Sequence, residues 1–191
     1  MIPRLVVATK NQDKVVEIEA VLGETGLAYE IVRGLSWPDV AETGETLEDN
    51  ALIKARAVVE ATGLPVIADD TGLEVAALDG APGVHTARFA GEGATYRDNV
   101  VKLLEVMNGR SDRSARFRTV VALALPDGST LTREGTLEGT IATAPRGEGG
   151  FGYDPVFEVG KETLAEMSTE EKNRVSHRAR AIRALAASLG R

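Results

Sequence analysis

Pro65-Val66-Ile67-Ala68-Asp69-Asp70-Thr71-Gly72-Leu73 is the stretch around which this chain is organised. A short apolar run bounded by turn residues predicts a buried strand, and two adjacent carboxylates follow it directly. Because successive side chains of a strand point to opposite faces, Asp69 and Asp70 are expected to diverge. Two anions at the end of a buried strand are costly unless a divalent metal ion, a lysine or an arginine lies nearby. The alternative is a strand end followed by a solvated Asx turn.

The segments before this stretch alternate between strand and helix patterns. Residues 5–8 predict a first strand, and apolar residues then recur at helical spacing from Val15 to Leu22, with Glu17 and Glu19 off that stripe. Residues 29–32 predict a second strand. Residues 46–62 predict a second helix that Thr46 caps and Gly63 ends. This order of elements predicts an α/β fold.

The second half of the chain adds antiparallel strands. Residues 72–93 are rich in Gly and Ala and predict a long functional loop. A helix is expected after Thr95, with Val100, Val101, Leu104 and Met107 on its buried face. Residues 116–125 and 130–143 predict strands joined by a turn, and the apolar spacing after Asn173 predicts one C-terminal helix. We therefore expect a mixed sheet.

Length and composition limit the possible functions. The 191 residues predict a single domain, residues 1–191, that has room for two lobes. The net charge of −7 argues against a general affinity for the nucleic-acid backbone. The absence of cysteine excludes a disulfide framework and a thiol nucleophile. Without a signal-peptide pattern or a membrane-length apolar run, a soluble cytoplasmic protein with no membrane partner is expected.

Two loops of the first half carry candidate phosphate and metal ligands. Thr9, Asn11 and Lys14 follow the first strand, where a helix N-terminus presents backbone N–H groups and favours an anion. The alternative there is an ordinary capped turn. A second loop carries Asp39, Glu42, Glu45 and Glu48, and a few carboxylates together with substrate phosphates suit Mg²⁺. The alternative is a solvated acidic loop.

Two segments of the second half carry candidate groups for binding a planar base. Residues 147–155 combine glycines with Phe151 and Tyr153, on which a base could stack, although each ring is about as well explained as part of the core. Lys172, His177 and Arg178 are expected at the start of the last helix, where they could meet phosphate or base carbonyls.

Taken in order, these motifs closely resemble those of the inosine/xanthosine triphosphate pyrophosphatase family, which clears non-standard purine nucleotides. The resemblance covers essentially the whole chain, and the ordered set is specific although each motif alone is weak. The motifs are Thr9-x-Asn11-x-x-Lys14, Glu42-Thr43-Gly44-x-Thr46-x-x-x-Asn50-Ala51, Ala68-Asp69-Asp70-Thr71-Gly72-Leu73, Ala81-Pro82-Gly83, Gly150-Phe151-Gly152-Tyr153-Asp154-Pro155-x-Phe157 and Ser176-His177-Arg178.

The resemblance implies a two-lobed α/β fold with a central mixed sheet flanked by helices and an active-site cleft between the lobes. It implies a homodimer that uses Mg²⁺ to hydrolyse ITP, dITP and XTP to the monophosphate and pyrophosphate. Residue by residue, Glu42 and Asp70 match metal ligands, and Asp70 also matches the base that activates the attacking water. The substrate contacts that the resemblance implies are Thr9, Lys10, Asn11, Lys14, Thr71, Phe151, Gly152, Tyr153, Asp154, Lys172, His177 and Arg178.

The sequence departs from the family pattern at a few positions and leaves other functions open. Thr71 stands where serine is commoner, and His85-Thr86 and Phe89 stand where Tyr-Ser and Tyr are expected. A donor that faces the purine 6-oxygen would reject adenine but not guanine. The alternatives are a nucleotide sensor that does not cleave its ligand, a related pyrophosphatase for modified pyrimidines or another triphosphate, and a purely structural protein.

Overall fold

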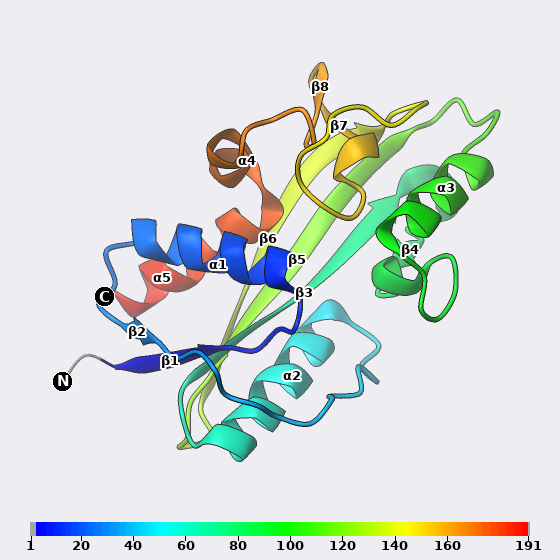
Figure 1. The fold of residues 1–191 in the computed structure, drawn as a ribbon. Coiled ribbons are helices and arrows are strands. Elements are labelled where there is room, and N and C mark those ends of the chain that lie inside the picture. Colours follow the sequence, from blue (N-terminus) through cyan, green and yellow to red (C-terminus); the bar gives the residue numbers. More distant parts are fainter. Residues whose placement is uncertain (1–2, 191) are drawn as a thin grey trace. The chain divides into compact units, whose positions relative to one another are not determined.

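The structure is a computed structural model that describes residues 3–190 (Figure 1). The expected α/β class and mixed sheet are confirmed. The sheet runs in the order β2-β1-β3-β5-β6-β7-β8, with β4 paired to β3. The strands are β1 (Arg4–Val7), β2 (Glu30–Ile31), β3 (Val66–Val75), β4 (Pro82–Gly83), β5 (Ser114–Ala124), β6 (Thr130–Ile141), β7 (Phe157–Val159) and β8 (Glu162–Thr163). The helices are α1 (Gln12–Glu24), α2 (Leu47–Thr62), α3 (Tyr96–Val106), α4 (Thr169–Val175) and α5 (His177–Leu189), with short 3₁₀ turns at Ala76–Leu78, Thr86–Arg88 and Asp154–Val156.

The described chain divides into two compact units. The first holds the residues up to Asp70, together with Thr119–Gly135 and the residues from His177 onward. The second holds Thr71–Arg118 and Thr136–Ser176. The chain therefore passes from one unit to the other within β3, β5 and β6, and again between α4 and α5.

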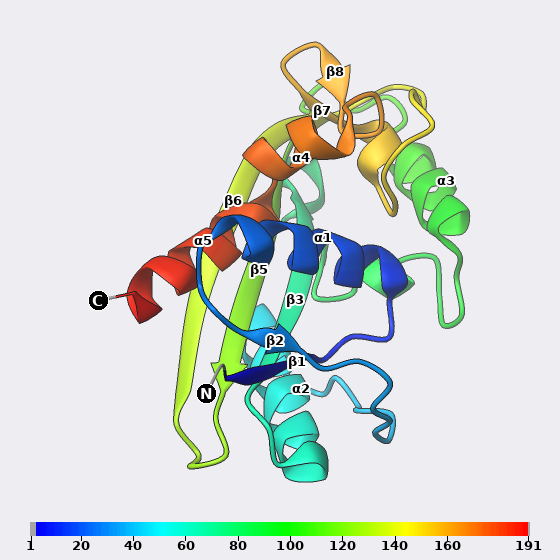
Figure 2. The same cartoon turned by 60° about the vertical axis from the view of Figure 1, so that its left-hand side comes forward.

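The first unit is built on the parallel part of the sheet. Strand β1 pairs in parallel with β2 on one side and with β3 on the other, where Val6 lies opposite Val66. Helices α1 and α5 run side by side in both views (Figures 1 and 2). Their apolar faces share one core with β1, β3 and β5, which includes Ile18, Ile67 and Ile182.

The second unit has its own core around the antiparallel strands. Strand β7 pairs antiparallel with both β6 and β8. Phe157 and Phe117 lie in contact there, with ring centroids 4.6 Å apart, and the core also holds Leu103 of α3 and Met107, the residue that caps the C-terminal end of α3. The Thr95–Asp98 capping box begins α3, as Ser168 and Glu171 begin α4.

Three expectations about elements of the second half are wrong. Strand β3 does not end at the Asp69-Asp70 pair but continues to Val75, and β4 follows, so residues 72–93 are not one long loop. On the buried side of α3, Val100 and Met107 are buried as expected, but Val101 is 47 % exposed and Leu103 rather than Leu104 is fully buried. The C-terminal helix is two helices, since Ser176 takes an extended backbone conformation between α4 and α5.

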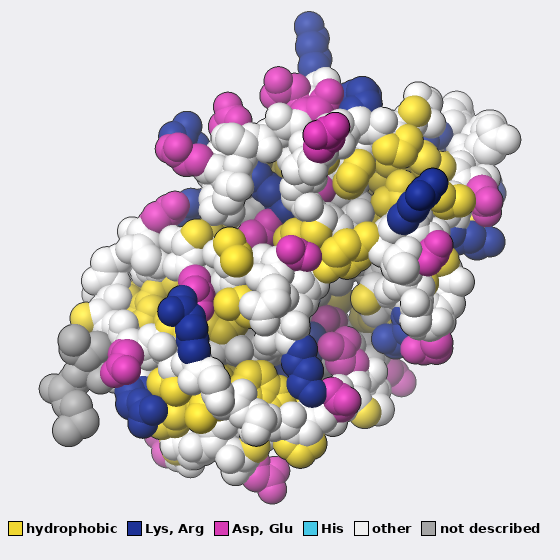
Figure 3. All heavy atoms as spheres, viewed as in Figure 1, with side chains coloured by type: hydrophobic (Ala, Val, Ile, Leu, Met, Phe, Trp, Pro, Cys, Tyr) yellow, Lys and Arg dark blue, Asp and Glu magenta, His cyan; other side chains and the backbone are white. Residues whose placement is uncertain are grey.

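The distribution of surface charge and the apolar character of the helices complete the description of the fold. On the face shown in Figure 3, Lys and Arg side chains lie among Asp and Glu side chains, so they do not form one positively charged patch there. Within residues 3–190, no helix has the length and apolar character needed to cross a membrane.

Gly135 on β6 allows α5 to approach the sheet closely. A β-carbon at this position would lie 2.1 Å from the carbonyl oxygen of His177 and 2.5 Å from the amide nitrogen of Ala181. Both atoms are helix backbone, which has no flexible end that can move aside. The absence of a side chain at Gly135 therefore sets where the first turn of α5 lies on the sheet.

We expect Gly135→Ala to lower the free energy of unfolding by about 1–3 kcal/mol, the usual cost of overpacking a buried contact. In a chain of this size that is a fall of roughly 2–12 °C in the melting temperature. The control is Gly23→Ala in α1, where a β-carbon meets nothing within 4 Å and the melting temperature should stay or rise. Equal melting temperatures for Gly135→Ala and the unsubstituted protein would contradict the packing argument.

Candidate active site

Asp69 faces helices α1 and α5, where two cations hold it. Its Oδ2 lies 3.0 Å from the Nζ of Lys14 and accepts a hydrogen bond of 3.1 Å from the Nε of Arg178. Arg178 also donates a hydrogen bond from its Nη1 to Glu17. All four side chains are largely or fully buried. The alternative of a solvated Asx turn is therefore wrong for Asp69, because its carboxylate is buried in a network of two anions and two cations.

The burial of these groups shifts their pKa values in opposite directions. Burial alone would raise the pKa of Asp69, but Lys14, Arg178 and Lys54 together hold the pKa of its carboxyl well below its usual range. Burial lowers the pKa of Lys14, and Asp69 opposes that shift. The helix dipole disfavours a lysine in the first turn of α1 unless an anion is near, and Asp69 is that anion.

Asp70 points to the opposite face of β3, toward α2, so the expected divergence of the two carboxylates is confirmed. Its Oδ1 accepts a hydrogen bond of 2.8 Å from the Nζ of Lys54, and its Oδ2 lies 3.4 Å from the Nδ2 of Asn50. The same Lys54 nitrogen lies 3.0 Å from Oε1 of Glu42. Glu42 and Asp70, the two expected metal ligands, therefore converge on one ammonium group.

Asp70 is a stronger base than an ordinary aspartate. Burial raises its pKa, while Lys54 opposes the shift without cancelling it. Burial would lower the pKa of Lys54, but Asp70, Asp69 and Glu42 outweigh that effect and raise it. A buried carboxylate with a raised pKa next to a charged partner is typical of groups that accept protons in active sites.

The turn between β1 and α1 is a capped turn. The side-chain oxygen of Asn11 accepts hydrogen bonds from the backbone N–H groups of Asp13 and Lys14, at 3.0 and 3.4 Å. The hydroxyl of Thr9 in turn accepts from the backbone N–H of Asn11, at 3.1 Å. The backbone N–H groups of Asn11, Asp13 and Lys14 thus have partners within the turn.

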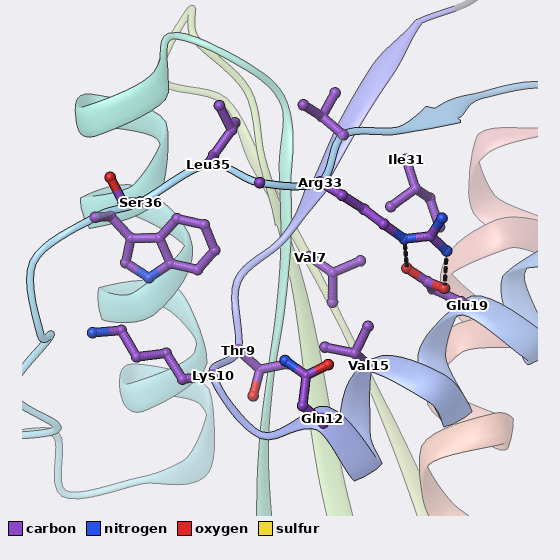
Figure 4. Close-up of a pocket in the computed structure, with 13 residues that line it drawn as sticks. Val7, Thr9, Lys10, Gln12, Val15, Glu19, Ile31, Arg33, Leu35 and Ser36 are labelled. Atoms are coloured by element: carbon purple, nitrogen blue, oxygen red, sulfur yellow. Dashed lines mark hydrogen bonds and ion pairs between the residues drawn. The ribbon is translucent and has the colours of Figure 1, made fainter.

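A pocket of about 440 Å³ opens beside this turn (Figure 4). Thr9 and Lys10 line it together with Gln12 and Val15 of α1, and the segment from Ile31 to Trp37 closes its other side. Its cations are paired, since Lys10 contacts Asp39 and Arg33 contacts Glu19. Figure 4 shows the Arg33–Glu19 pair at one side of the pocket, with Val7 and Val15 nearby.

Asp154 organises the glycine-rich segment in the second unit. Its Oδ2 accepts a hydrogen bond of 2.8 Å from the backbone N–H of Phe151 and one of 2.5 Å from the Nζ of Lys172. Gly150 takes a left-handed backbone conformation with φ of 67°, and a β-carbon there would lie 2.1 Å from the same carboxylate oxygen. Glycine is therefore required for the loop to fold around Asp154.

The two rings of this segment lie in different surroundings. Phe151 is half-buried, with the Nζ of Lys172 4.5 Å from its ring centroid and the ring of Tyr96 at 5.9 Å. Tyr153 is buried in the core, and its hydroxyl donates to the carbonyl oxygen of Thr86 at 2.9 Å. The hypothesis that a base stacks on the ring is thus wrong for Tyr153, because this ring packs in the core. For Phe151 the stacking hypothesis stays a prediction.

The last candidates are separated between the two units. Lys172 lies in α4, whereas His177 and Arg178 begin α5, so the expectation that all three open one helix is wrong. The Nδ1 of His177 lies 2.6 Å from the hydroxyl of Thr119 on β5. Two further candidates are Gly152 and Thr71. Gly152 has a left-handed backbone conformation with φ of 65°, and Thr71 follows Asp70 directly on β3.

Comparison with known proteins places these residues in a family. A model of the Ham1 family matches residues 5–188. The chain belongs to the Ham1 family.

The chain is 49 % identical to a dITP/XTP pyrophosphatase of Exiguobacterium sp., over 97 % of this chain and 96 % of the relative. It is 48 % identical to a dITP/XTP pyrophosphatase of Streptomyces coelicolor, over 95 % and 94 % of the two chains. A solved Ham1 protein of Coxiella burnetii superposes with a TM-score of 0.87 at 42 % identity, covering 98 % of each chain. The family resemblance predicted from the motifs is confirmed.

Two charged residues of this Ham1 chain were missed by the sequence reasoning. Lys54 lies beside the small apolar residues on the buried face of α2, one turn after Asn50. Glu17 lies on the buried face of α1, where Lys14, Glu17, Ile18 and Val21 follow helical spacing, although it was expected off that stripe. The available signal was a charged residue within an apolar stripe, which indicates a buried partner of opposite charge.

We expect Glu17→Gln to lower the free energy of unfolding by about 3–5 kcal/mol, because it leaves Arg178 buried with less compensating charge. The matched control is Glu19→Gln on the same helix, whose partner Arg33 is 74 % exposed, so its loss should cost at most about 1 kcal/mol. Urea unfolding of both variants measures the difference. Equal losses would show that the buried pair contributes no more than the surface pair.

Proposed function

We propose that this chain is a Mg²⁺-dependent pyrophosphatase that hydrolyses ITP, dITP and XTP to the monophosphate and pyrophosphate. The observation that carries the proposal is the cluster of Asp70, Lys54 and Glu42, in which two carboxylates meet one ammonium group beside a buried strand. The curated relatives from Exiguobacterium sp. and Streptomyces coelicolor, at 48–49 % identity, carry the name dITP/XTP pyrophosphatase and support the choice of substrate.

The donor set of the cluster suits Mg²⁺. Mg²⁺ prefers one or two carboxylates completed by water and substrate phosphates, and Glu42 and Asp70 are such a pair. Both already lie within 3.0 Å of a positive charge, the Lys54 nitrogen, so the carboxylates are arranged around a cation. Within residues 3–190, no group of three or more His, Cys, Asp or Glu side chains is placed to hold a metal ion. Bound there, Mg²⁺ would neutralise phosphate charge and acidify a water molecule.

Asp70 is proposed as the group that takes the proton of the attacking water. Its raised pKa makes its carboxylate a better acceptor, and Lys54 fixes the position of Oδ1. Lys54 and Lys14 would add positive charge for the triphosphate, together with Thr9, Lys10, Asn11 and Thr71. Phosphoryl transfer depends chiefly on such positioning and charge neutralisation rather than on covalent help from the protein.

The base is proposed to bind at Phe151, Gly152, Asp154, Lys172, His177 and Arg178, with Tyr153 supporting the loop from the core. Phe151 offers a half-buried ring face, and Asp154 holds Lys172 beside it. The pairs of Arg178 with Asp69 and Glu17 hold its guanidinium group in place at the start of α5.

We further propose that the protein is a homodimer, on the strength of the family resemblance. Light scattering should give a mass near twice 20.2 kDa, and a monomer at micromolar concentration would contradict this part of the proposal.

With Mg²⁺ present, we expect rapid pyrophosphate release from ITP and XTP and little from ATP and GTP. Chelation of the metal with EDTA should stop the reaction, and added Mg²⁺ should restore it. Binding of ITP without release of pyrophosphate would favour a nucleotide sensor. Equal release from all four nucleotides would keep the catalytic cluster and reject the assignment of the base site.

We expect Asp70→Asn to lower kcat for ITP by about 10²–10⁴-fold, the usual contribution of a positioned general base. The control is Asp127→Asn in the turn between β5 and β6, where the carboxylate contacts Ser129 and activity should be unchanged. Circular dichroism of both variants checks that the fold is kept. Full activity in Asp70→Asn would exclude Asp70 as the base.

A further inference from the structure

A buried hydroxyl faces the histidine that begins α5. The Oγ1 of Thr119 and the Nδ1 of His177 lie 2.6 Å apart, a short hydrogen bond between two side chains that are 0 % and 4 % exposed. Burying a hydroxyl or an imidazole is costly without a hydrogen-bond partner, so the pair holds the ring in one orientation. Thr119 interrupts a row on β5 that is otherwise apolar, between Phe117 and Val121.

The backbone around the pair leaves it little freedom. His177 is the first residue of α5, and its carbonyl oxygen packs against Gly135 on β6, where no side chain can be accommodated. On β5, Val121 lies two residues from Thr119 and belongs to the same core as Ala181 and Ile182 of α5. The face of β5 that carries Thr119 is therefore covered by the helix that carries His177.

We propose that Thr119 is a positioning residue for base selection: its hydroxyl donates to Nδ1 and holds neutral His177 in the tautomer that carries hydrogen on Nε2. A neutral imidazole has one donor nitrogen and one acceptor nitrogen, so a partner on one nitrogen decides the role of the other. With Nδ1 as the acceptor, Nε2 is a fixed donor. This inference rests on the proposed function, in which His177 contacts the purine base.

The direction of this hydrogen bond decides which base the ring accepts. A donor at Nε2 pairs with the 6-oxygen of hypoxanthine or xanthine and opposes the 6-amino group of adenine, which is itself a donor. If Thr119 instead accepted a hydrogen from Nδ1, Nε2 would be an acceptor and would favour adenine. A mismatch of this kind leaves polar groups unpaired in a buried site, which discriminates strongly between substrates.

The tautomer can be measured directly because the chain has two histidines. In a His85→Gln background, ¹⁵N NMR of the ring without nucleotide should show a bare Nδ1 and a protonated Nε2. Thr119→Ser keeps the hydroxyl and should keep this pattern. Thr119→Val removes the hydroxyl but keeps the shape, and the two signals should move toward one another as the tautomers exchange. A protonated Nδ1 in the parent, or unchanged signals in Thr119→Val, would overturn the proposal.

Activity gives the second readout. The ratio of kcat/KM for ITP to that for ATP should fall about tenfold in Thr119→Val, the effect expected for one hydrogen bond. It should stay within about twofold of the parent in Thr119→Ser. A purely structural role would lower both activities together and leave the ratio unchanged, which would overturn the proposal. If the parent hydrolyses neither nucleotide, the proposed function is wrong, and the NMR result alone decides the tautomer.

Discussion

The placement of two adjacent buried carboxylates on β3 is the constraint on which the rest of the structure depends. Asp69 and Asp70 point to opposite faces of the strand, so each needs compensating charge from a different layer of helices. Lys14 and Arg178 approach Asp69 from α1 and α5, and Lys54 approaches Asp70 from α2. The helices on each face are thus tied electrostatically to the same two residues of the sheet.

The two faces have different chemical consequences. Around Asp69 the charges are balanced and buried, the pKa of its carboxyl is depressed, and the network serves to position α1 and α5. Around Asp70 the pKa is raised, and Glu42, which is partly exposed, shares Lys54 with it. A stable ion-pair network and a basic carboxylate therefore occupy neighbouring positions of one strand, because alternation separates their surroundings.

Close backbone approach is the second constraint that positions residues of the proposed site. Gly135 lets the start of α5 lie on the sheet, which places His177 against Thr119, and Gly150 lets the loop fold around Asp154. In each case a β-carbon would meet atoms that cannot move without displacing a residue of the proposed site. The glycines of the sequence matter at these positions for the space that they leave as much as for their backbone freedom.

The α/β class, the mixed sheet, most element positions and the family followed from the sequence, because hydrophobic periodicity, capping residues and ordered motifs are local signals. The divergence of Asp69 and Asp70 also followed, from strand geometry. Tertiary structure alone decided that β3 continues to Val75, that Lys54 joins Asp70 to Glu42, and that Glu17 is buried against Arg178. These features depend on which charged groups meet across elements that are distant in the chain. The spacing of residues along one element does not determine that pairing.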